Sequence, residues 1–397
     1  MPSESRNTYP ELCGKDECTA CGACVTSCPR EALAMEADKN GFSYPVINTS
    51  DCIGCLKCEK ACPAKHKEGR RNGKPRIVVS GWIKDEKSRQ SSSSGGAFSA
   101  IAEYTIEKGG CVCGAAYDEN LKLTYQIVEK KEELQRLMGS KYVQAEVGTI
   151  FKEIKKQLET GRKVLFCGTP CHVRGLYATV GNKANLLTID FICHGVPSPL
   201  TFEKYICWLK EKKNTAISNY NFRDKRFGTS YNIATSYDDG RTNNHILTGE
   251  SNSYCIAYNR NIMLRESCYN CSSNGMERDS DFTLGDYRDK DYTIAEEAKG
   301  VSTIICNSDR AKELLPTLNL EYRDDDIEKV IIKNPNYTKR TPKPSEETRN
   351  GFFAKLQNET YEAAMKEYAK PTLSHRIKTA IMLTLGPKFF CILKHIK

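Results

Sequence analysis

The spacing of apolar and polar residues divides most of the chain into alternating strands and helices. Short apolar runs rich in β-branched residues predict strands, and apolar residues three or four positions apart predict helices. The predicted strands are 76–84, 111–117, 121–128, 163–168, 186–193 and 300–308. The predicted helices are 95–108, 130–138, 148–159, 199–213 and 309–318, with a short one between strands 163–168 and 186–193. The fold class is therefore α/β or α+β, with a mixed core domain around a partly parallel sheet.

Two local signals complete the pattern of elements. Asp239-Gly240 lies between two polar strands and predicts a hairpin. After Asn334 the sequence becomes rich in proline and lysine, which predicts that the chain leaves the core there.

The first 66 residues carry an internal repeat of cysteines. Four cysteines recur after a shift of 34 residues, and both sets read C-x-x-C-x-x-C-x-x-x-C-P. This is the spacing of bacterial two-cluster ferredoxins, in which the fourth cysteine of each run binds the other 4Fe–4S cluster. The predicted ligand sets are Cys18, Cys21, Cys24 and Cys62 for one cluster, and Cys52, Cys55, Cys58 and Cys28 for the other. Zinc and disulfides are the alternatives, but zinc does not need eight cysteines in two matching sets.

Twenty cysteines are many for a chain of otherwise ordinary composition. Hydrophobic residues make up 39% and charged residues 27% of the 397 positions. The first residues are polar, without the apolar segment of a signal peptide, and no run of eighteen apolar residues predicts a transmembrane helix. We therefore expect a cytoplasmic protein, in which cysteines serve metal or redox chemistry rather than disulfides.

The net charge of +9 is concentrated in the segments 65–89 and 366–397. Such runs are solvated faces or docking sites for an acidic redox partner or an anionic surface. No zinc-finger, RNP or helix-turn-helix pattern accompanies them, so no nucleic-acid partner is expected. The last apolar stretch, 379–397, is interrupted by Pro387 and Lys388, and it predicts a packing element or a weak peripheral membrane contact.

Four further cysteines follow the ends of predicted strands or precede a Gly-Asp turn. Cys171 comes just after the strand 163–168, Cys193 ends the strand 186–193, and the motif CYNC supplies Cys268 and Cys271. Sites in open α/β sheets form where strands end, so these thiols are expected to converge. Their spacing alone allows buried structural thiols, a zinc site, a redox disulfide between Cys268 and Cys271, or a third 4Fe–4S cluster.

Six motifs occur in a fixed order after the ferredoxin-like repeat: SSSSGGAFSAI, GSKYVQA, CGTPCHVRGL, ICHGVPS, FRDKRFG and CYNC…DFTLGD. Together they resemble the beta subunit family of coenzyme F420 (deazaflavin) hydrogenases and dehydrogenases, over roughly residues 10–335. The resemblance implies FAD and one 4Fe–4S cluster in the core. Carried over to this chain, it implies as cluster ligands Cys171, Cys193, Cys268 and Cys271, with Cys167 accessory. His172 and Thr229 depart from the family motifs, which usually have Gln and Trp there. These departures leave the cluster ligands unchanged but leave open whether the family's substrate is used.

A flavin would connect the clusters to hydride chemistry, because it accepts single electrons as well as pairs. Neither a G-x-G-x-x-G motif nor a P-loop occurs, so the start of a helix after the serine–glycine segment is the best phosphate site. The candidate cofactor-binding residues are Ser93, Ser94, Gly95, Gly96, Lys141, Gly168, Thr169 and Pro170. A flexible linker is the alternative for SSSSGG, and a surface lysine for Lys141. His172, His194 and Asp286 are possible proton donors, and no catalytic residue is assigned.

The predicted organisation is a ferredoxin-like domain (1–66), a linker (67–76), a flavin and iron–sulfur core (77–335, in two parts, 77–162 and 163–335) and a basic C-terminal tail (336–397). The predicted function is an FAD- and iron–sulfur-dependent oxidoreductase that passes electrons between a ferredoxin or other redox protein and a small organic substrate. A non-catalytic electron-transfer subunit of a larger redox complex is the alternative. The substrate and the direction of electron flow are left open.

Overall fold

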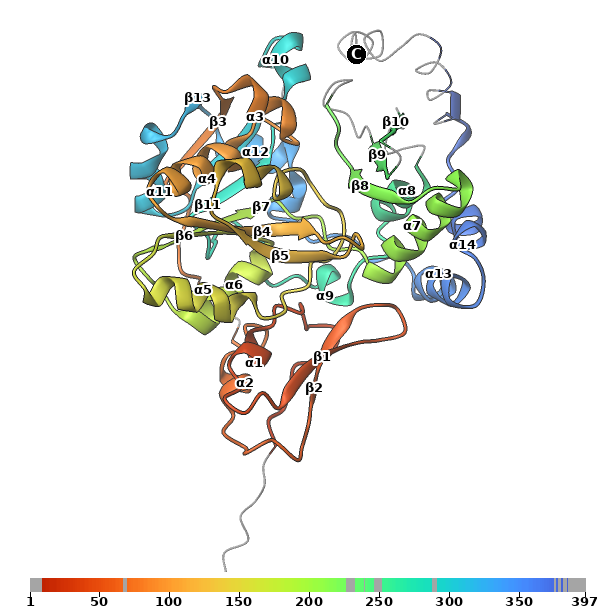
Figure 1. The fold of residues 1–397 in the computed structure, drawn as a ribbon, viewed down its shortest axis with the longest axis horizontal. Helices are drawn as coiled ribbons and strands as arrows, with labels where there is room; N and C mark the ends of the chain where they lie inside the picture. The colour runs from red at the N-terminus through yellow and green to blue at the C-terminus, as the bar shows by residue number, and fades with distance from the viewer. Residues whose placement is uncertain are drawn as a thin grey trace, which may run out of the picture.

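A small N-terminal domain lies at one end of a larger α/β body (Figure 1). The computed structural model describes residues 9–66, 70–225, 233–238, 240–245, 252–287 and 291–374, and the single positions 376, 377, 380 and 384. The apolar stretch 379–397, expected to pack or to touch a membrane, therefore lies almost entirely outside the described residues. In the described part, no helix is both long and apolar enough to cross a membrane.

The N-terminal domain folds as the cysteine repeat predicts, in two equivalent halves. Its elements are α1 (Ala23–Thr26), β1 (Leu33–Ala37), β2 (Ser43–Ile47) and α2 (Lys57–Lys60), and β1 pairs with β2 in antiparallel register. Gly22 and Leu56 occupy equivalent places before the two short helices, and both have positive φ, 72° and 57°. The left-handed residue turns each cysteine loop so that its thiols face inward.

The core domain is built on an eight-stranded mixed sheet. Its strands, in spatial order, are β13 (Leu320–Asp324), β3 (Ile77–Ile83), β12 (Ser302–Cys306), β11 (Phe282–Asp286), β7 (Leu186–Phe191), β6 (Val164–Cys167), β4 (Cys111–Tyr117) and β5 (Leu123–Val128). The pairs from β11 to β4 are parallel, and the others are antiparallel. The prediction of a partly parallel sheet is confirmed.

Helices cover both faces of this sheet, which explains its nearly continuous apolar strands. One apolar layer contains Val112 and Leu165 with α4 (Ala97–Glu107), and the other contains Cys113 and Phe166 with α5 (Ile150–Glu159) and α6 (Pro170–Val180). The remaining helices around the sheet are α3 (Glu86–Ser91), α9 (Glu266–Tyr269), α10 (Ile294–Lys299), α11 (Asp309–Leu314) and α12 (Ile327–Lys333), with the 3₁₀ turns η1 (Lys131–Arg136), η2 (Leu315–Thr317) and η3 (Pro335–Tyr337).

A second, three-stranded sheet stands beside the large one and packs on helices rich in aromatic residues (Figure 1). It consists of β8 (Ile217–Asn221), β9 (Ile233–Tyr237) and β10 (Thr242–His245), next to α7 (Pro199–Lys213), α8 (Ser253–Asn259), α13 (Glu346–Asn358) and α14 (Tyr361–Tyr368). β9 and β10 form an antiparallel hairpin as predicted, with Gly240 at φ 79°. Asp239 itself lies outside the described residues.

Two segments differ from the sequence-based expectation. Residues 131–136 form the 3₁₀ turn η1 where an α-helix over 130–138 was expected. The segment expected to leave the core after Asn334 returns to it, because α13 and α14 bury Phe352, Leu356 and Met365 in the main apolar cluster. The local richness in proline and lysine hid this amphipathic pattern, whose apolar positions pack on distant parts of the chain, with α14 against α7 and α8 and Phe353 of α13 against Phe42.

The described part of the expected linker, 70–76, is bound to the core and forms a third difference. The guanidinium of Arg71 forms an ion pair with Asp281 (3.1 Å), and Asn72 donates to the carbonyl of Ser280 (2.7 Å). The polar residues that predicted a free linker are therefore bound to the core, and Arg71 among them binds a buried carboxylate. The N-terminal domain is thus connected to the core by an anchored strap.

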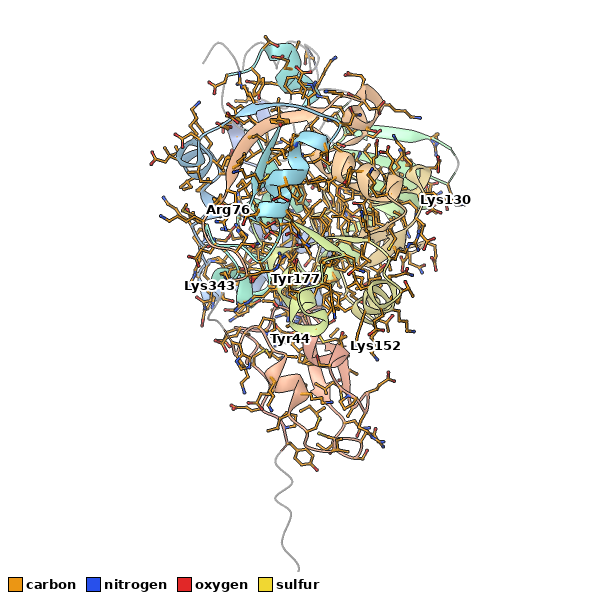
Figure 2. The ribbon with its side chains drawn as sticks, turned by 90° about the vertical axis from the view of Figure 1, so that its left-hand side faces the viewer. Tyr44, Arg76, Lys130, Lys152, Tyr177 and Lys343 are labelled. Carbon is orange, nitrogen blue, oxygen red and sulfur yellow. The ribbon has the colours of Figure 1, made fainter. Side chains whose placement is uncertain are left out.

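The N-terminal domain contacts the core through α6 and the loops around it. Gly175 lies so close to Cys21 that a Cβ at this position would stand 2.7 Å from the Cys21 Cβ and 3.0 Å from its Sγ. At the margin of the same junction, Lys152 forms an ion pair with Glu31, and Figure 2 shows Lys152 and Tyr44 where the two parts meet. The contact is therefore close-packed at its centre and charged at its edge.

We expect Gly175→Ala to loosen this junction. The added methyl group overlaps backbone and Cβ atoms, so the free energy of unfolding should fall by about 1–3 kcal/mol, as in other overpacked cores. Urea unfolding followed by iron–sulfur absorbance measures the effect. Ala178→Ser, at an exposed position of the same helix, is the control. An unchanged midpoint in Gly175→Ala would show that the two parts do not pack as described.

Candidate iron–sulfur site

The eight motif cysteines of the N-terminal domain line two separate cavities. One cavity is lined by Cys18, Cys21, Cys24 and Cys62, and the other by Cys28, Cys52, Cys55 and Cys58. These are the two crossed sets that the spacing predicts. We call them the inner-facing set and the outer set, because Cys21 of the first packs against Gly175 of the core, whereas the second includes the exposed Cys55.

Cys13 is a fifth cysteine of the inner-facing cavity, and the repeat gave no signal for it. A hydrogen bond from Cys13 lowers the pKa of Cys18, and a second one lowers the pKa of Cys62. The same hydrogen bonds raise the pKa of Cys13 itself. The Cys13 thiol therefore lies close to two of the proposed cluster ligands.

The four later cysteines converge on one cavity of the core domain, which we call the core cavity. They are Cys171 in the first turn of α6, Cys193 just after β7, Cys268 on α9, and Cys271 just after α9. β6 and β7 are parallel, so their carboxyl ends bring Cys171 and Cys193 to the same edge of the sheet. The empty space of the core cavity, counted together with open solvent at its mouth, is about 560 Å³.

The groups around the core cavity fit an anionic cluster. Burial raises the pKa of Cys268 to about 11, and it raises the pKa of Cys193 as well. Such thiols become thiolates when a bound metal replaces the proton. The Val196 amide donates to Cys268 Sγ (3.4 Å), and two fully buried arginines, Arg265 and Arg278, line the wall. A positive, amide-lined cavity with four thiols is the chemistry that a 4Fe–4S cluster requires.

A cubane cluster binds each thiolate at a different iron, so its ligands surround a cavity instead of meeting at one point. Within the described residues, no group of three or more Cys, His, Asp or Glu side chains could hold one metal ion. All three cysteine sets surround a cavity in this way.

The two histidines considered as proton donors lie in different places. His194 lines the core cavity, where its Nε2 donates to Asn261 Oδ1 (2.7 Å) and its Nδ1 accepts from Asn336 Nδ2 (2.8 Å). His172 is buried outside that wall, with Nδ1 2.9 Å from the Tyr125 hydroxyl, and burial lowers its pKa to about 4. Of these two histidines, only His194 is therefore beside the core cysteines.

Asp286, the third possible proton donor, does not line the core cavity, and its carboxylate is bound to an arginine. Its Oδ2 accepts from the guanidinium of Arg223 (2.6 Å), in the FRDKRFG motif. The carboxylate thus links β11 to the segment after β8.

The candidate flavin residues of the serine–glycine segment lie between α3 and α4, packed on β3 and β12. Ser93 Oγ accepts from the Ser140 amide (2.5 Å), Ser94 Oγ donates to the Val301 carbonyl (2.7 Å), and the Gly95 amide donates to Ser302 Oγ (2.9 Å). Gly96 precedes the first residue of α4. The segment is therefore an ordered part of the core, and its hydroxyl groups already bind neighbouring groups.

Two lysines accompany this segment, the partly buried Lys141 and the buried Lys225. The Lys141 ammonium donates to the carbonyls of Met138 (2.9 Å) and Leu137 (3.1 Å), and burial lowers its pKa to about 8. The Lys225 ammonium donates to the carbonyls of Ser94 (2.7 Å) and Lys299 (2.8 Å), and burial lowers its pKa to about 7. The motifs SSSSGG, GSKY and FRDK therefore meet in space, although they lie far apart in the sequence.

The turn Gly168-Thr169-Pro170 connects β6 to α6 beside Cys171. Thr169 precedes the first residue of α6, its hydroxyl lies 3.2 Å from Cys171 Sγ, and Pro170 lines the core cavity. Gly168 packs on Tyr125 and Phe166. These residues therefore lie beside the core cysteines, and the serine–glycine segment lies elsewhere on the sheet.

Among the residues of the core cavity that sequence reasoning missed are Thr19, Arg265 and Arg278. Thr19 lines both the core cavity and the inner-facing cavity, so the two cavities share a wall. The only available signal was its place directly after a cluster cysteine. No local pattern indicates that an arginine will be buried beside a site.

Comparisons with known proteins agree with this architecture. Residues 17–66 match the family model of a 4Fe–4S dicluster domain, so the chain is an iron–sulfur redox protein. Residues 78–152 and 161–323 match the two models, N-terminal and C-terminal, of the coenzyme F420 hydrogenase/dehydrogenase beta subunit, which together span more than half of the sequence. The chain belongs to the coenzyme F420 hydrogenase/dehydrogenase beta subunit family, as the six motifs predicted.

Curated relatives are similar at low identity. One subunit of the F(420)H(2) dehydrogenase of Methanosarcina mazei is 26% identical over 206 residues, covering 46% of this chain and 55% of that protein. The VorC protein of the ketoisovalerate oxidoreductase of Methanothermobacter marburgensis is 33% identical over 60 residues, 15% of this chain and 75% of that protein. The chain spans somewhat more than half the length of the first of these. Both names describe subunits of oxidoreductases.

One solved structure is similar across most of the chain. It is a chain of the F420-reducing NiFe hydrogenase complex from Methanosarcina barkeri, with a TM-score of 0.42 and 15% identity, covering 76% of this chain and 94% of that chain. The assignment to the family comes from the sequence matches alone.

Proposed function

We propose that this protein passes electrons between a ferredoxin-type partner and a small organic substrate, by way of three 4Fe–4S clusters and FAD. The observation that carries the proposal is the order of the three cysteine cavities. The outer set includes the exposed Cys55, three of the four inner-facing cysteines are buried, and Thr19 lines both the inner-facing cavity and the core cavity. Clusters in these cavities would supply one-electron transfer from the surface to the core.

In this proposal, residues 1–66 form the domain at which electrons enter or leave. Pro29 and Arg30 line the outer cavity together with Ile53, whose side chain is 62% exposed, so a redox protein can approach this end closely. The core, from residue 77 onward, would exchange electrons with the substrate. Supporting evidence is that a curated relative is a subunit of a dehydrogenase.

The FAD is proposed from the family and from the meeting of its motifs. The serine–glycine segment, Lys141 and Lys225 gather on one side of the sheet, and two of these groups are cationic side chains that suit a phosphate. A flavin is the group that converts single electrons into a hydride equivalent.

A specific observation favours the second candidate, an electron-transfer subunit without a flavin. The hydroxyls of Ser93 and Ser94 and the ammonium of Lys141 are bound to protein groups, so a flavin phosphate would have to displace these contacts. In that case the chain would pass electrons to the active site of a partner subunit.

One measurement distinguishes the flavin-dependent reductase from the electron-transfer subunit. It is the content of iron, acid-labile sulfide and released flavin per chain, on anaerobically purified protein. About twelve irons with one FAD are expected for the reductase. About twelve irons without flavin support the electron-transfer subunit. About eight irons contradict the assignment of Cys171, Cys193, Cys268 and Cys271 as cluster ligands.

A further inference from the structure

Arg265 is a fully buried arginine between the core cavity and the inner-facing cysteines. Among the described residues, no carboxylate forms an ion pair with it. We propose that Arg265 is the positive group that raises the reduction potentials of the clusters on its two sides and thereby favours electron passage across the domain junction. The part of this inference that concerns the core cavity rests on the proposed third cluster.

The guanidinium of Arg265 connects the two cysteine sites directly. Its Nε donates to the carbonyl of Cys18 (2.6 Å), and one terminal nitrogen donates to Gln144 Oε1 (3.2 Å). The amide of the same Gln144 donates to the carbonyl of Thr19 (3.3 Å). The other terminal nitrogen donates to the carbonyl of Ser43 (3.0 Å). These partners of the guanidinium are all neutral, and two of the contacts hold the loop of Cys18 and Thr19.

The backbone places Arg265 next to the core cysteines as well. The Arg265 amide donates to the carbonyl of Val196 (2.9 Å), and the Cys268 amide donates to the carbonyl of Arg265 (3.0 Å). Arg265 directly precedes α9, which carries Cys268. One residue thus contacts a proposed ligand of each cluster.

A guanidinium stays charged in a protein, and burying a charge without a counter-ion is costly. The ring of Tyr44, 4.4 Å from the guanidinium carbon, offers weak compensation. Clusters with four thiolate ligands are anionic and gain one more negative charge when reduced. They can therefore act as the missing counter-ions, and a fixed positive charge favours their reduced state.

The other buried arginine of the core cavity, Arg278, differs from Arg265 in having a carboxylate partner. Arg278 lies 3.7 Å from the buried carboxylate of Asp190, which balances its charge. Nearby, Arg349 faces Glu266 at 3.5 Å. Arg265 differs from both, because no carboxylate of the described residues forms an ion pair with it.

The test is a redox titration of the purified full-length chain, followed by EPR, with Arg265→Met and Arg265→Lys. Arg265→Met should lower the midpoint potential of the cluster bound by Cys18. A tenfold loss in the equilibrium constant for reduction corresponds to about 59 mV for one electron. Arg265→Lys keeps the charge and should stay close to the unaltered chain. Lys152→Met, which breaks the exposed ion pair at the same junction, is the control and should not change the potential.

Two results would overturn the proposal. One is an unchanged midpoint potential in Arg265→Met with a full iron content. The other is an equal fall in Arg265→Lys, which would assign the effect to lost hydrogen bonds. If the Met variant loses iron, Arg265→Gln takes its place as the variant without the charge, and a fall in potential there beside an unchanged potential in Arg265→Lys supports the role of charge. If the unaltered chain holds only about eight irons, the proposed function fails, whereas the cluster of Cys18 still tests Arg265.

Discussion

A chain in which Cys268 and Cys271 are both replaced by serine is expected to lose about four of its irons and to keep about eight. The two thiols form half of the set around the core cavity, and a cluster cannot remain on Cys171 and Cys193 alone. Reduction of the proposed flavin, or of a partner, by a ferredoxin-type donor should then stop. The clusters of the N-terminal domain should still be reduced, because their eight ligands lie in separate cavities.

Iron analysis, together with EPR of the dithionite-reduced protein, measures this result. Cys207→Ser is the matched control, because Cys207 is an exposed cysteine on α7. It should retain all the iron and the full rate. If the double variant kept the iron content of the unaltered chain, the core cysteines would be structural thiols, and the proposed order of electron transfer would be wrong.

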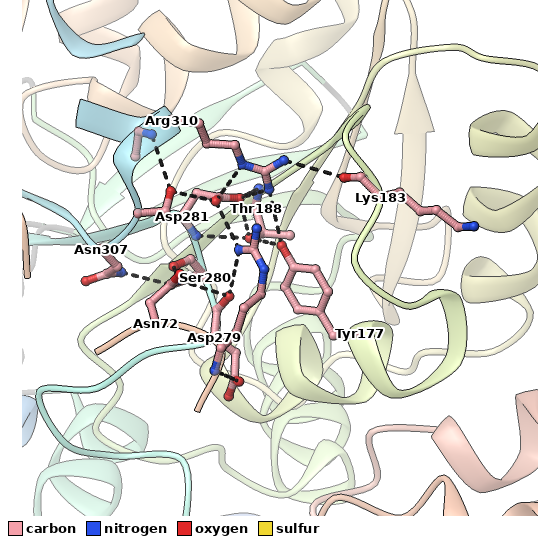
Figure 3. A network of polar contacts seen from close by, with 12 residues as sticks. Asn72, Tyr177, Lys183, Thr188, Asp279, Ser280, Asp281, Asn307 and Arg310 are labelled. Carbon is pink, nitrogen blue, oxygen red and sulfur yellow. Dashed lines mark hydrogen bonds and ion pairs between the residues drawn. The ribbon is translucent and has the colours of Figure 1, made fainter. Parts of the chain in front are cut away.

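The second large effect is expected for Asp281→Asn, in the polar network shown in Figure 3. Asp281 is fully buried and accepts from the Thr188 amide (2.9 Å), from Ser308 Oγ (2.8 Å) and from Arg310 Nε (2.7 Å). Arg71 forms a further ion pair with the same carboxylate. The network therefore joins β7, the segment before β11, α11 and the strap that leads to the N-terminal domain.

Removing the charge leaves two arginines without their partner. Breaking a buried ion pair costs about 3–5 kcal/mol. Because both arginines are partly exposed to solvent, we expect Asp281→Asn to lower the free energy of unfolding by about 3 kcal/mol, the lower end of this range. Urea unfolding at neutral pH measures it. The control is Asp309→Asn, which removes an exposed Asp–Arg pair with Arg76 and should change little. Equal effects in both variants would show that the network does not stabilise the fold.

The carboxylate of Asp281 should also make the free energy of unfolding depend on pH, in a direction that can be predicted. Burial alone would raise the pKa of Asp281, but the hydrogen bond and charge of Arg310 outweigh it and hold the pKa below its ordinary value. In the unfolded chain the pKa of an aspartate is about 4. Because the pKa of Asp281 is lower in the folded chain, its carboxylate stabilises the fold fully above about pH 4, and this stabilisation is lost as the pH falls toward the folded-state pKa. The difference in unfolding free energy between the unaltered chain and Asp281→Asn should therefore shrink below about pH 4. A constant difference in urea unfolding from neutral pH down to about pH 3 would contradict this account.

Several features followed from the sequence itself, because they depend on short-range spacing. The repeat of C-x-x-C-x-x-C-x-x-x-C-P predicted the crossed sets of cysteines, and the structure gathers those same sets around two cavities. Apolar periodicity predicted α7 over Pro199–Lys213 at its observed bounds and predicted the parallel strands β6 and β7. The order of the motifs predicted the family, which the sequence matches confirm.

Other features depend on contacts between distant segments, and local spacing holds no record of them. The bound strap of Arg71, the return of α13 and α14 to the core, and the contact of Gly175 with Cys21 each require a partner surface that exists only in the folded chain. Arg265 shows the reason most clearly. Its sequence neighbours give no sign that it is buried, whereas folding brings its guanidinium between a loop 247 residues earlier and the core cysteines. Sequence determined which groups can bind clusters, and tertiary structure decided which charge lies between them, because an electrostatic effect depends on distance in space.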